Sequence, residues 1–173
     1  MQRLFLIGYR GSGKSTVARL VAERLGWSSI DSDDEVERRV GMTIAAIFAT
    51  EGEQAFRNHE EKVVASLCTR NRAAIALGGG AVLRDATRRR LKKSGPVVWL
   101  TASAATLTAR IAADTATASR RPSLTGVGAA EEVERLLAVR EPTYRECATV
   151  AVAVDGRTPE AIADEIVALL DRS

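Results

Sequence analysis

The feature that most constrains this chain is the segment Gly8–Thr16, which reads GYRGSGKST. It matches the pattern GxxxxGK[ST], in which glycines let backbone N–H groups wrap closely around a phosphate. A short apolar run, Arg3–Ile7, precedes the segment, and a helical pattern over Lys14–Leu25 follows it. Because the pattern requires a strand before it and a helix after it, we expect a loop that binds a nucleoside triphosphate and Mg²⁺.

Each position of this phosphate loop has an expected role. The backbone of the loop donates N–H groups, and the helix that starts near Lys14 directs the positive end of its dipole at the same anion. Lys14 is expected to reach the β- and γ-phosphates, and the Ser15 hydroxyl to bind Mg²⁺. The predicted nucleotide-binding residues of the loop are Gly11, Ser12, Gly13, Lys14, Ser15 and Thr16.

Short apolar runs alternate with longer amphipathic runs along the rest of the chain. The predicted strands are Arg3–Ile7, Ser29–Asp31, Ala74–Leu77, Val97–Leu100 and Val150–Val154. The predicted helices are Lys14–Leu25, Asp34–Val40, Glu53–Leu67, Asp85–Lys93, Ala104–Ala112, Glu131–Arg145 and Thr158–Leu170. Apolar strands separated by helices are typical of an α/β fold with a parallel sheet. The 173 residues, 46% of them hydrophobic and 27% charged, predict a single domain over 1–173.

The composition excludes several other classes of protein. No apolar run approaches the ~18–20 residues that cross a bilayer, and Met1–Gly8 does not resemble a signal peptide because its short apolar stretch leads directly into glycines. A net charge of +3 does not by itself call for a nucleic-acid partner, and we expect none. The basic cluster Arg88–Lys93 has the pattern of a solvated helix face, with a patch that binds a polyanion as the alternative. Cys68 and Cys147 are expected to be buried free thiols. We therefore expect a cytoplasmic protein that acts on a small molecule.

Carboxylates and glycines follow two of the predicted strands. Asp31 and Asp33 come after the second strand, where the carboxyl end of a parallel sheet would place them near the phosphate loop. If that strand continues, both acids lie on one side, one for the metal shell and one for a substrate hydroxyl; alternatively, Asp33 caps the next helix. Gly78–Gly80 ends the third strand and predicts close approach of a ligand or another backbone, with a simple tight turn as the alternative.

Two arginines and one irregular segment have more than one interpretation. Arg57 precedes Glu60 and Glu61 by three and four residues, so it either forms a surface ion pair or is a guanidinium held by Glu60 and directed at a carboxylate. Arg140, just before Glu141, likewise either forms a surface ion pair or is directed at a carboxylate. The segment 114–130 has few apolar residues around the pair Arg120-Arg121 and is expected to be a lid or binding loop rather than an idle surface loop.

Together these segments resemble the shikimate kinase family over nearly the whole chain. The resemblance rests on Gly8–Thr16, Asp31–Asp33, Thr43–Phe48, Gly52–Glu60, Gly78–Gly80 and Arg121-Pro122, which occur in the family's order. The stretch GExxFRxxE is far more specific than the phosphate loop. The resemblance implies transfer of the ATP γ-phosphoryl group to the 3-hydroxyl of shikimate, giving shikimate 3-phosphate on the route to chorismate and the aromatic amino acids.

The resemblance also implies an architecture. It is a three-layer P-loop kinase fold of the nucleoside-monophosphate-kinase type, with a five-stranded parallel sheet flanked by helices. A substrate-binding region over about 33–61, a mobile lid over about 114–130 and a monomeric enzyme are expected with it.

The roles of individual residues are likewise implied by the resemblance. Asp33 would bind the substrate hydroxyls and orient the attacking one, and it forms the catalytic set with Lys14 and the lid arginine, Arg121. Arg57 and Arg140 would hold the shikimate carboxylate. The remaining implied contacts are Gly79 and Gly80 to the substrate, Asp31 to the Mg²⁺ shell around Ser15, Arg121 to the ATP phosphates, and Arg110 and Arg157 to the adenine.

Two other functions fit the phosphate loop. One is a small P-loop kinase with another acceptor, such as gluconate or a nucleoside monophosphate, and the other is a regulator that binds ATP without turnover. Two arginines with Asp33 favour a hydroxylated carboxylic acid as acceptor, and the presence of Lys14, Ser15 and Asp31 favours an active enzyme.

Overall fold

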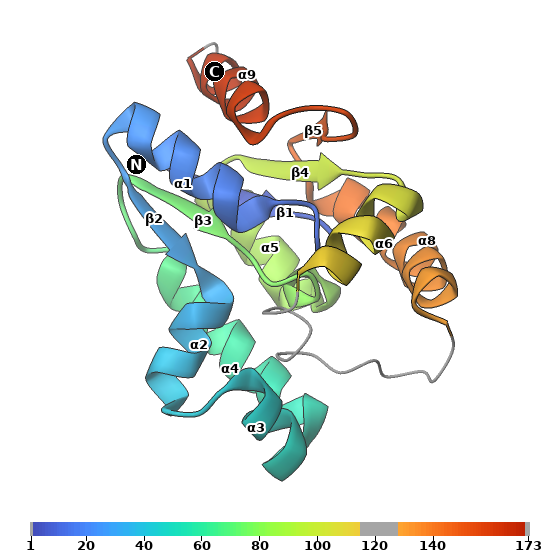
Figure 1. The fold of residues 1–173 in the computed structure, drawn as a ribbon. Helices are drawn as coiled ribbons and strands as arrows, with labels where there is room; N and C mark the ends of the chain where they lie inside the picture. Colours follow the sequence, from blue (N-terminus) through green and yellow to red (C-terminus); the bar gives the residue numbers. More distant parts are fainter. Residues whose placement is uncertain (1, 115–127, 172–173) are drawn as a thin grey trace.

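In a computed structural model that describes residues 2–114 and 128–171, one parallel sheet forms the centre of the molecule (Figure 1). Its strands are β1 (Arg3–Ile7), β2 (Ser28–Asp31), β3 (Ala73–Ala76), β4 (Val97–Thr101) and β5 (Val150–Ala153). Within the described residues the five strands are ordered β2-β3-β1-β4-β5, and every neighbouring pair is parallel. The strand order therefore reverses beside β1, where ligands bind in open α/β sheets. The predicted fold class is confirmed.

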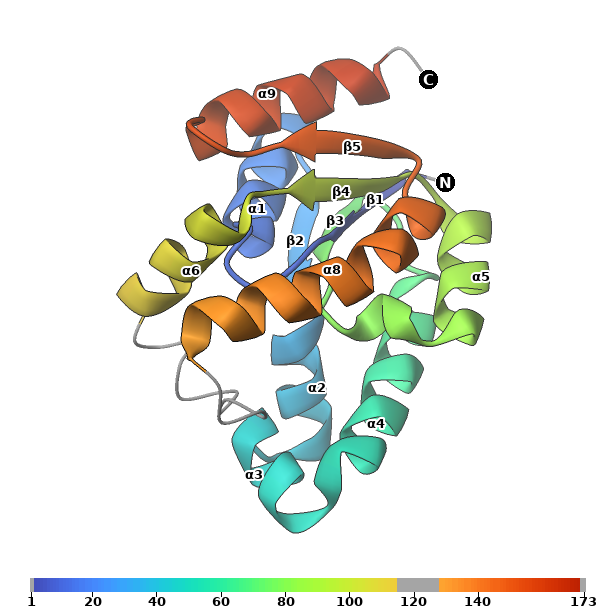
Figure 2. The same ribbon diagram turned by 90° about the vertical axis from the view of Figure 1, so that its right-hand side faces the viewer.

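Helices cover both faces of this sheet. The helices are α1 (Lys14–Leu25), α2 (Ser32–Val40), α3 (Ile44–Thr50), α4 (Gly52–Leu67), α5 (Asp85–Ser94), α6 (Ala104–Ala113), α8 (Ala129–Cys147) and α9 (Pro159–Leu170), with a 3₁₀ turn at Ala81–Leu83. Helices α1 and α9 lie on one face, and α5 and α8 lie on the other (Figure 2). Three layers result, as expected.

The side chains of the central strand show why the sheet needs two covering layers. Phe5 and Ile7 pack with the α4, α5 and α8 side, whereas Leu4 and Leu6 pack with α1 and α9. All four side chains are fully or almost fully buried. Alternate residues of a strand point to opposite faces, so an uninterrupted apolar strand requires an apolar partner on each side.

Helices α2, α3 and α4 pack together and extend from one side of the sheet, beyond the carboxyl end of β2 (Figures 1 and 2). Helix α3 was not among the predicted helices, since it spans only seven residues. The Thr43 side chain caps it by accepting a hydrogen bond from the Ala46 N–H at 3.2 Å. This group of helices carries two of the predicted substrate-binding residues, Asp33 and Arg57.

The lid prediction falls on the part of the chain that is not described. Of the segment 114–130, only Asp114 and the residues from Gly128 onward are described. Arg120 and Arg121 lie outside the described residues.

Two further expectations concern the helices and the thiols. None of the helices in the described ranges combines the length and the apolar character needed to cross a membrane. Cys68 and Cys147 are free and buried, as predicted. Burial raises the pKa of Cys147 to about 11, so this thiol is protonated at neutral pH.

Replacing Ile75 by Ala is expected to lower the free energy of unfolding by about 2–5 kcal/mol. Ile75 lies on β3, is completely buried, and packs in the core below α4 and α8, so its loss leaves a cavity. Urea denaturation measures the change. The matched control is Val139→Ala on α8, whose side chain is 66% exposed and whose substitution should change stability by no more than about 0.5 kcal/mol. Equal losses in the two variants would contradict this description of the core.

Candidate active site

A cavity of about 350 Å³ lies at the carboxyl ends of β1, β2 and β3. The phosphate loop forms one wall, and Asp31, Asp33 and Gly78-Gly79 form another. Arg110 and Asp114 line it as well. The structure thus brings together the loop, the acids and the glycines that the sequence analysis singled out separately.

The phosphate loop has a backbone that only glycine adopts readily. Gly8, Gly11 and Gly13 have positive φ angles of 146°, 83° and 88°. A Cβ atom on Gly8 would lie 2.7 Å from the Leu100 carbonyl oxygen, so a side chain there would clash with β4. Lys14 Nζ donates hydrogen bonds to the carbonyl oxygens of Gly8 at 3.0 Å and Tyr9 at 2.9 Å. The lysine is therefore folded back over its own loop, at the N-terminus of α1.

Asp31 joins the phosphate loop to the start of α2. Its Oδ2 accepts a hydrogen bond from the Ser15 hydroxyl at 2.5 Å, and its Oδ1 accepts one from the Asp33 N–H at 2.9 Å. The second bond makes Asp31 the N-cap of α2, so both expectations for Asp33 are corrected: β2 does not continue beyond Asp31, and Asp33 is not the cap. Instead Asp33 sits in the first turn of α2 and reaches the cavity from there.

The residues at this end of the cavity fit a nucleoside triphosphate with Mg²⁺. The glycine backbone leaves room for phosphate oxygens next to N–H groups and the N-terminus of a helix. The Ser15 hydroxyl and the Asp31 carboxylate supply hard oxygen atoms, the ligands that Mg²⁺ prefers.

The glycine triplet lies directly against the phosphate loop. A Cβ atom on Gly79 would lie 3.4 Å from both the Gly8 carbonyl oxygen and the Arg10 nitrogen. The N–H of Gly78 donates to the buried Ser32 hydroxyl at 2.9 Å, which ties β3 to the start of α2. The expected close approach of another backbone is therefore confirmed. A simple tight turn does not by itself describe the triplet.

Arg57 is held in a largely buried position beneath the triplet. Its side chain is 12% exposed, and Nη1 donates to the buried Glu60 carboxylate at 2.7 Å, with Glu53 at 3.4 Å from Nη2. A Cβ atom on Gly80 would fall 2.5 Å from Nη2, so the absence of a side chain at Gly80 makes room for the guanidinium. Burial acts to lower the pKa of Arg57, but the Glu60 carboxylate outweighs it and the pKa is raised.

The alternative of a surface ion pair is thus wrong for Arg57. Glu61, the other acid in the predicted spacing, instead accepts from Arg84 at 2.6 Å. Arg57 is a desolvated cation in a fixed orientation, which is the state of a guanidinium that recognises a carboxylate.

Arg140, on α8, also contacts a loop of the site. Its guanidinium carbon lies 5.4 Å from the centroid of the Tyr9 ring, within the range of a cation–π interaction. Tyr9 belongs to the phosphate loop and is 6% exposed, and burial raises the pKa of its hydroxyl. The Tyr9 ring therefore supports an arginine from a helix that is distant in the sequence.

The two arginines expected at the adenine differ in their positions. Arg110 Nη1 lies 3.5 Å from the Gly11 carbonyl oxygen and lines the cavity. Arg157 instead donates to the Ala153 carbonyl and pairs with Glu165 of α9 at 2.6 Å. Of these two arginines, only Arg110 lines the cavity at the phosphate loop.

Several residues of the site were missed in the sequence analysis. Ser32 and Tyr9 were read only as parts of larger motifs, although Ser32 binds Gly78 and Tyr9 supports Arg140. Arg10 and Asp114 also line the cavity. A serine between two acids at a strand end is the one signal that could have pointed to Ser32, whereas the contact of Tyr9 depends on the packing of α8.

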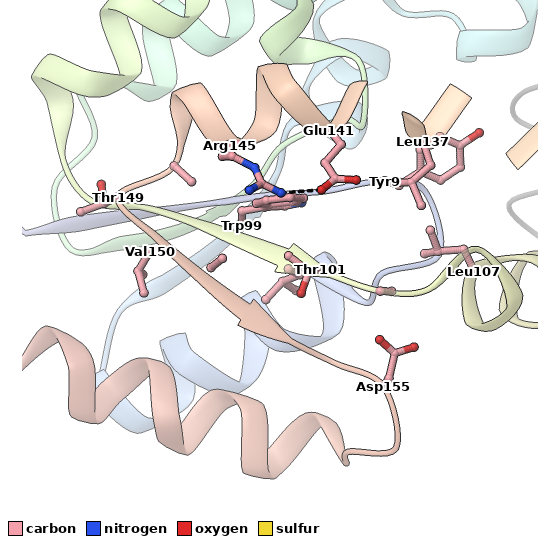
Figure 3. A pocket seen from close by; sticks show the side chains of 14 residues that line it. Tyr9, Trp99, Thr101, Leu107, Leu137, Glu141, Arg145, Thr149, Val150 and Asp155 are labelled. Atoms are coloured by element: carbon pink, nitrogen blue, oxygen red, sulfur yellow. Dashed lines mark hydrogen bonds and ion pairs between the residues drawn. The ribbon is translucent and has the colours of Figure 1, made fainter. Parts of the chain in front are cut away.

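A second cavity, of about 500 Å³, lies between α8 and the strands β4 and β5 (Figure 3). Trp99 and Tyr9 line it, and its charged side chains Arg145 and Glu141 pair with each other at 2.6 Å. Asp155, at its other end, accepts hydrogen bonds from Ser103. Because these charges are already matched, this cavity offers weaker recognition of an anion than the cavity at the phosphate loop.

The chain is similar to proteins of known function. A family model described as shikimate kinase matches residues 10–171. A shikimate kinase of Rhodopirellula baltica is 44% identical over 166 residues, which cover 96% of this chain and 89% of the relative. One of Oleidesulfovibrio alaskensis is 42% identical over 171 residues, 98% of each chain. The solved structure of shikimate kinase from Acinetobacter baumannii in complex with shikimate has a TM-score of 0.92 and 35% identity, covering 99% of this chain and 94% of that one.

Replacing Gly80 by Ala is expected to lower the free energy of unfolding by about 1–3 kcal/mol. The φ angle of −103° suits alanine, so without a clash this change would stabilise the protein by about 0.4–1 kcal/mol. The loss arises because the new methyl group overlaps the Arg57 guanidinium, which can move aside only by giving up its ion pair with the buried Glu60 carboxylate. Chemical denaturation measures the difference.

The control for this substitution is Gly128→Ala. Gly128 also has a negative φ angle, −55°, and the atom nearest to its added Cβ, Glu131 Oε2, would be 3.9 Å away. Its free energy of unfolding should change by no more than about 1 kcal/mol. Loss of the glycine N-cap lowers that free energy, whereas the smaller backbone freedom of the unfolded chain raises it. A Gly80→Ala protein more stable than wild type would contradict the position assigned to Arg57.

Proposed function

This chain belongs to the shikimate kinase family, and we propose that it transfers the γ-phosphoryl group of ATP to the 3-hydroxyl of shikimate. The products are shikimate 3-phosphate and ADP. The enzyme is an ATP-dependent small-molecule kinase of the pathway to chorismate and the aromatic amino acids. Shikimate is the ligand named for the structurally similar enzyme of Acinetobacter baumannii.

The observation that carries the proposal is a buried cation next to a phosphate loop. Arg57 lies under Gly80, and Gly79 packs against Gly8 and Arg10 of the loop. Arg140 lies on the Tyr9 ring of the same loop. An acceptor with a carboxylate bound by these guanidinium groups would therefore lie close to the terminal phosphate of a nucleotide in the loop.

The acceptor residues have distinct tasks in this proposal. Arg57, held by Glu60, and Arg140 bind the shikimate carboxylate, and the backbone of Gly79 and Gly80 contacts the ring. Asp33, in the first turn of α2, accepts hydrogen bonds from the substrate hydroxyls and directs the attacking one toward the phosphate. The region 33–61 supplies Asp33 and Arg57, so the helices beyond β2 form one part of the acceptor side, and Gly79, Gly80 and Arg140 form the other.

Phosphoryl transfer depends mainly on position and on neutralisation of charge, because its transition state is loose. A bond forms between the 3-hydroxyl oxygen and the γ-phosphorus, the bond from that phosphorus to the bridging oxygen of ADP breaks, and the hydroxyl proton passes to Asp33. Lys14, with the loop N–H groups from Gly11 to Thr16, neutralises the charge on the phosphoryl oxygens. Lys14 must leave its carbonyl partners in the loop to do so.

Ser15 and Asp31 are the residues that would hold Mg²⁺ at this site. When bound, the ion would supply neutralisation of the negative charge on the nucleotide phosphates. Asp31 Oδ1 also accepts a hydrogen bond from the Asp33 N–H, so the capped start of α2 orients Asp33 as well.

The remaining parts of the proposal concern the nucleotide and the setting of the enzyme. Arg110 and Arg157 border the adenine, and Arg121 reaches the phosphates from the lid over 114–130, on the strength of the family resemblance. The chain acts as a single P-loop kinase domain over 1–173, as a monomer in the cytoplasm. ATP and shikimate are its partners, and neither nucleic acid nor membrane is required.

The test of this function is the release of ADP from ATP and Mg²⁺ with different acceptors. Shikimate, gluconate and nucleoside monophosphates are assayed in parallel with the full chain, and shikimate 3-phosphate is identified by mass spectrometry. We expect turnover with shikimate and rates with the other acceptors at least about 100-fold lower, because only shikimate pairs a carboxylate with a correctly placed hydroxyl.

The control enzyme in this assay is Asp33→Asn. It keeps the size of the side chain and loses the proton acceptor, so kcat with shikimate should fall by about 100-fold or more. Turnover of gluconate or a nucleotide in preference to shikimate, or binding of ATP with no turnover of any acceptor, would refute the proposal.

Replacing Arg57 by Ala should raise the KM for shikimate by about 10-fold or more, because a charge-assisted contact with the carboxylate is lost. The KM for ATP should change little. The comparison variant is Arg89→Ala, which removes an arginine that is 70% exposed and paired with Asp85, and which should alter neither constant. Steady-state kinetics with each substrate varied in turn provide the measurement. An Arg57→Ala enzyme with the wild-type KM for shikimate would remove Arg57 from the acceptor site.

A further inference from the structure

Tyr144, on α8, is fully buried. Its hydroxyl donates a hydrogen bond to the carbonyl oxygen of Gly79 at 2.5 Å. Tyr144 stands one helical turn after Arg140, and it is separated from Gly79 by 65 residues of sequence. The contact therefore ties the helix that carries Arg140 to the glycine triplet.

The Tyr144 ring is itself held in place by its neighbours. Its centroid lies 6.0 Å from that of Trp99 on β4, with the ring planes inclined by 29°. The guanidinium of Arg145 lies 5.9 Å from the Trp99 centroid, and Figure 3 shows Arg145 beside the indole and joined to Glu141. A stacked ring in a packed core has little freedom to move, so the hydroxyl is a fixed donor.

The acceptor of this bond belongs to the most adaptable backbone of the site. Glycines have access to many φ and ψ combinations, and a run of three needs external contacts to keep one conformation. Gly78 has such contacts through its N–H to Ser32 and its carbonyl to the Ala81 N–H. The Gly80 carbonyl accepts from the Leu83 N–H at 3.1 Å. The bond from Tyr144 adds the corresponding contact at the Gly79 carbonyl.

Fixing this carbonyl also fixes the next amide. The peptide bonds of the described chain are trans, so the Gly79 carbonyl and the Gly80 N–H point in opposite directions. With the carbonyl bound by Tyr144, the Gly80 N–H points away from that ring. Gly80 in turn covers the Arg57 guanidinium, so rotation of this one peptide would disturb both the backbone contacts and the arginine of the acceptor site.

We propose that Tyr144 is a positioning residue for the acceptor: its hydroxyl orients the Gly79–Gly80 peptide, and with it the surface that receives the shikimate ring above Arg57. The inference rests on the proposed function. The nucleotide side depends less on this bond, because Lys14, Ser15 and Asp31 hold the phosphate loop through contacts of their own.

The test is Tyr144→Phe, which removes the hydroxyl and keeps the ring stacked on Trp99. In steady-state kinetics of the full chain we expect the KM for shikimate to rise about 3- to 10-fold, the usual effect of one neutral hydrogen bond. The KM for ATP should stay within about twofold of wild type. Assays are run well below the unfolding temperature of each variant, which is measured by circular dichroism.

The control is Ile166→Val on α9, a fully buried residue in the core on the opposite face of the sheet. It lowers stability by removing one methyl group far from the glycine triplet, and it should leave both KM values unchanged. A selective rise in the shikimate KM for Tyr144→Phe, absent from Ile166→Val, supports the inference. An unchanged shikimate KM, an equal rise in both KM values, or the same rise in the control would overturn it.

A second variant covers the case in which Tyr144→Phe does not fold. Trp99→Leu retains the hydroxyl but removes the ring against which Tyr144 stacks, so it should give the same selective change, about 2- to 5-fold in the KM for shikimate. An unchanged KM in this variant would count against the inference. Failure of the wild-type chain to phosphorylate shikimate would refute the proposed function instead, so the two failures are distinguishable.

Discussion

The close packing of two glycine-rich turns, one after β1 and one after β3, is the constraint on which the rest of the site depends. Gly79 approaches Gly8 and Arg10 so closely that a side chain would lie at 3.4 Å from their backbone atoms. The parallel pairing of β1 with β3 brings the two turns together, because it aligns the carboxyl ends of both strands. One turn is the proposed phosphate loop and the other covers Arg57. In the proposed reaction, the distance between the phosphate donor and the acceptor therefore follows from a contact between backbones.

This packing also determines how far the charged groups of the site are removed from water. Arginines on the surface, such as Arg89 in its pair with Asp85, stay solvated and contribute little to stability. Arg57 is desolvated, and it retains its charge because the buried Glu60 carboxylate lies 2.7 Å away. Breaking such a pair by removing one partner is costly, because it leaves an uncompensated charge away from water. The backbone beside this pair is itself bound, since Ser32 accepts a hydrogen bond from Gly78 and Tyr144 donates one to Gly79.

The parts of the molecule that the sequence predicts well are those with a local signal. The bounds of β1 and α1 agree with the prediction. Each is set by neighbouring residues: the apolar run forms the strand, the glycine loop ends it, and Lys14 begins the helix. The spacing of Arg57 and Glu60 allowed either a surface ion pair or a guanidinium held by Glu60, and the position of Arg57 below Gly80 excludes the surface pair. The start of α2 was placed two residues late, since the capping bond from Asp31 to the Asp33 N–H competes with continuation of the strand. The contacts of Tyr9 with Arg140 and of Tyr144 with Gly79 join distant segments, and no local pattern encodes them.

The central claim is that a carboxylate and a hydroxyl of one acceptor are bound next to the terminal phosphate by this arrangement. A crystal structure of the chain with shikimate, ADP and Mg²⁺ tests it most directly. The account predicts the shikimate carboxylate in contact with Arg57 and Arg140, the ring against Gly79 and Gly80, and the 3-hydroxyl within hydrogen-bond distance of Asp33 on the side that faces the β-phosphate. Shikimate bound elsewhere, for instance in the cavity beside Trp99, or bound with its carboxylate directed to solvent, would contradict it.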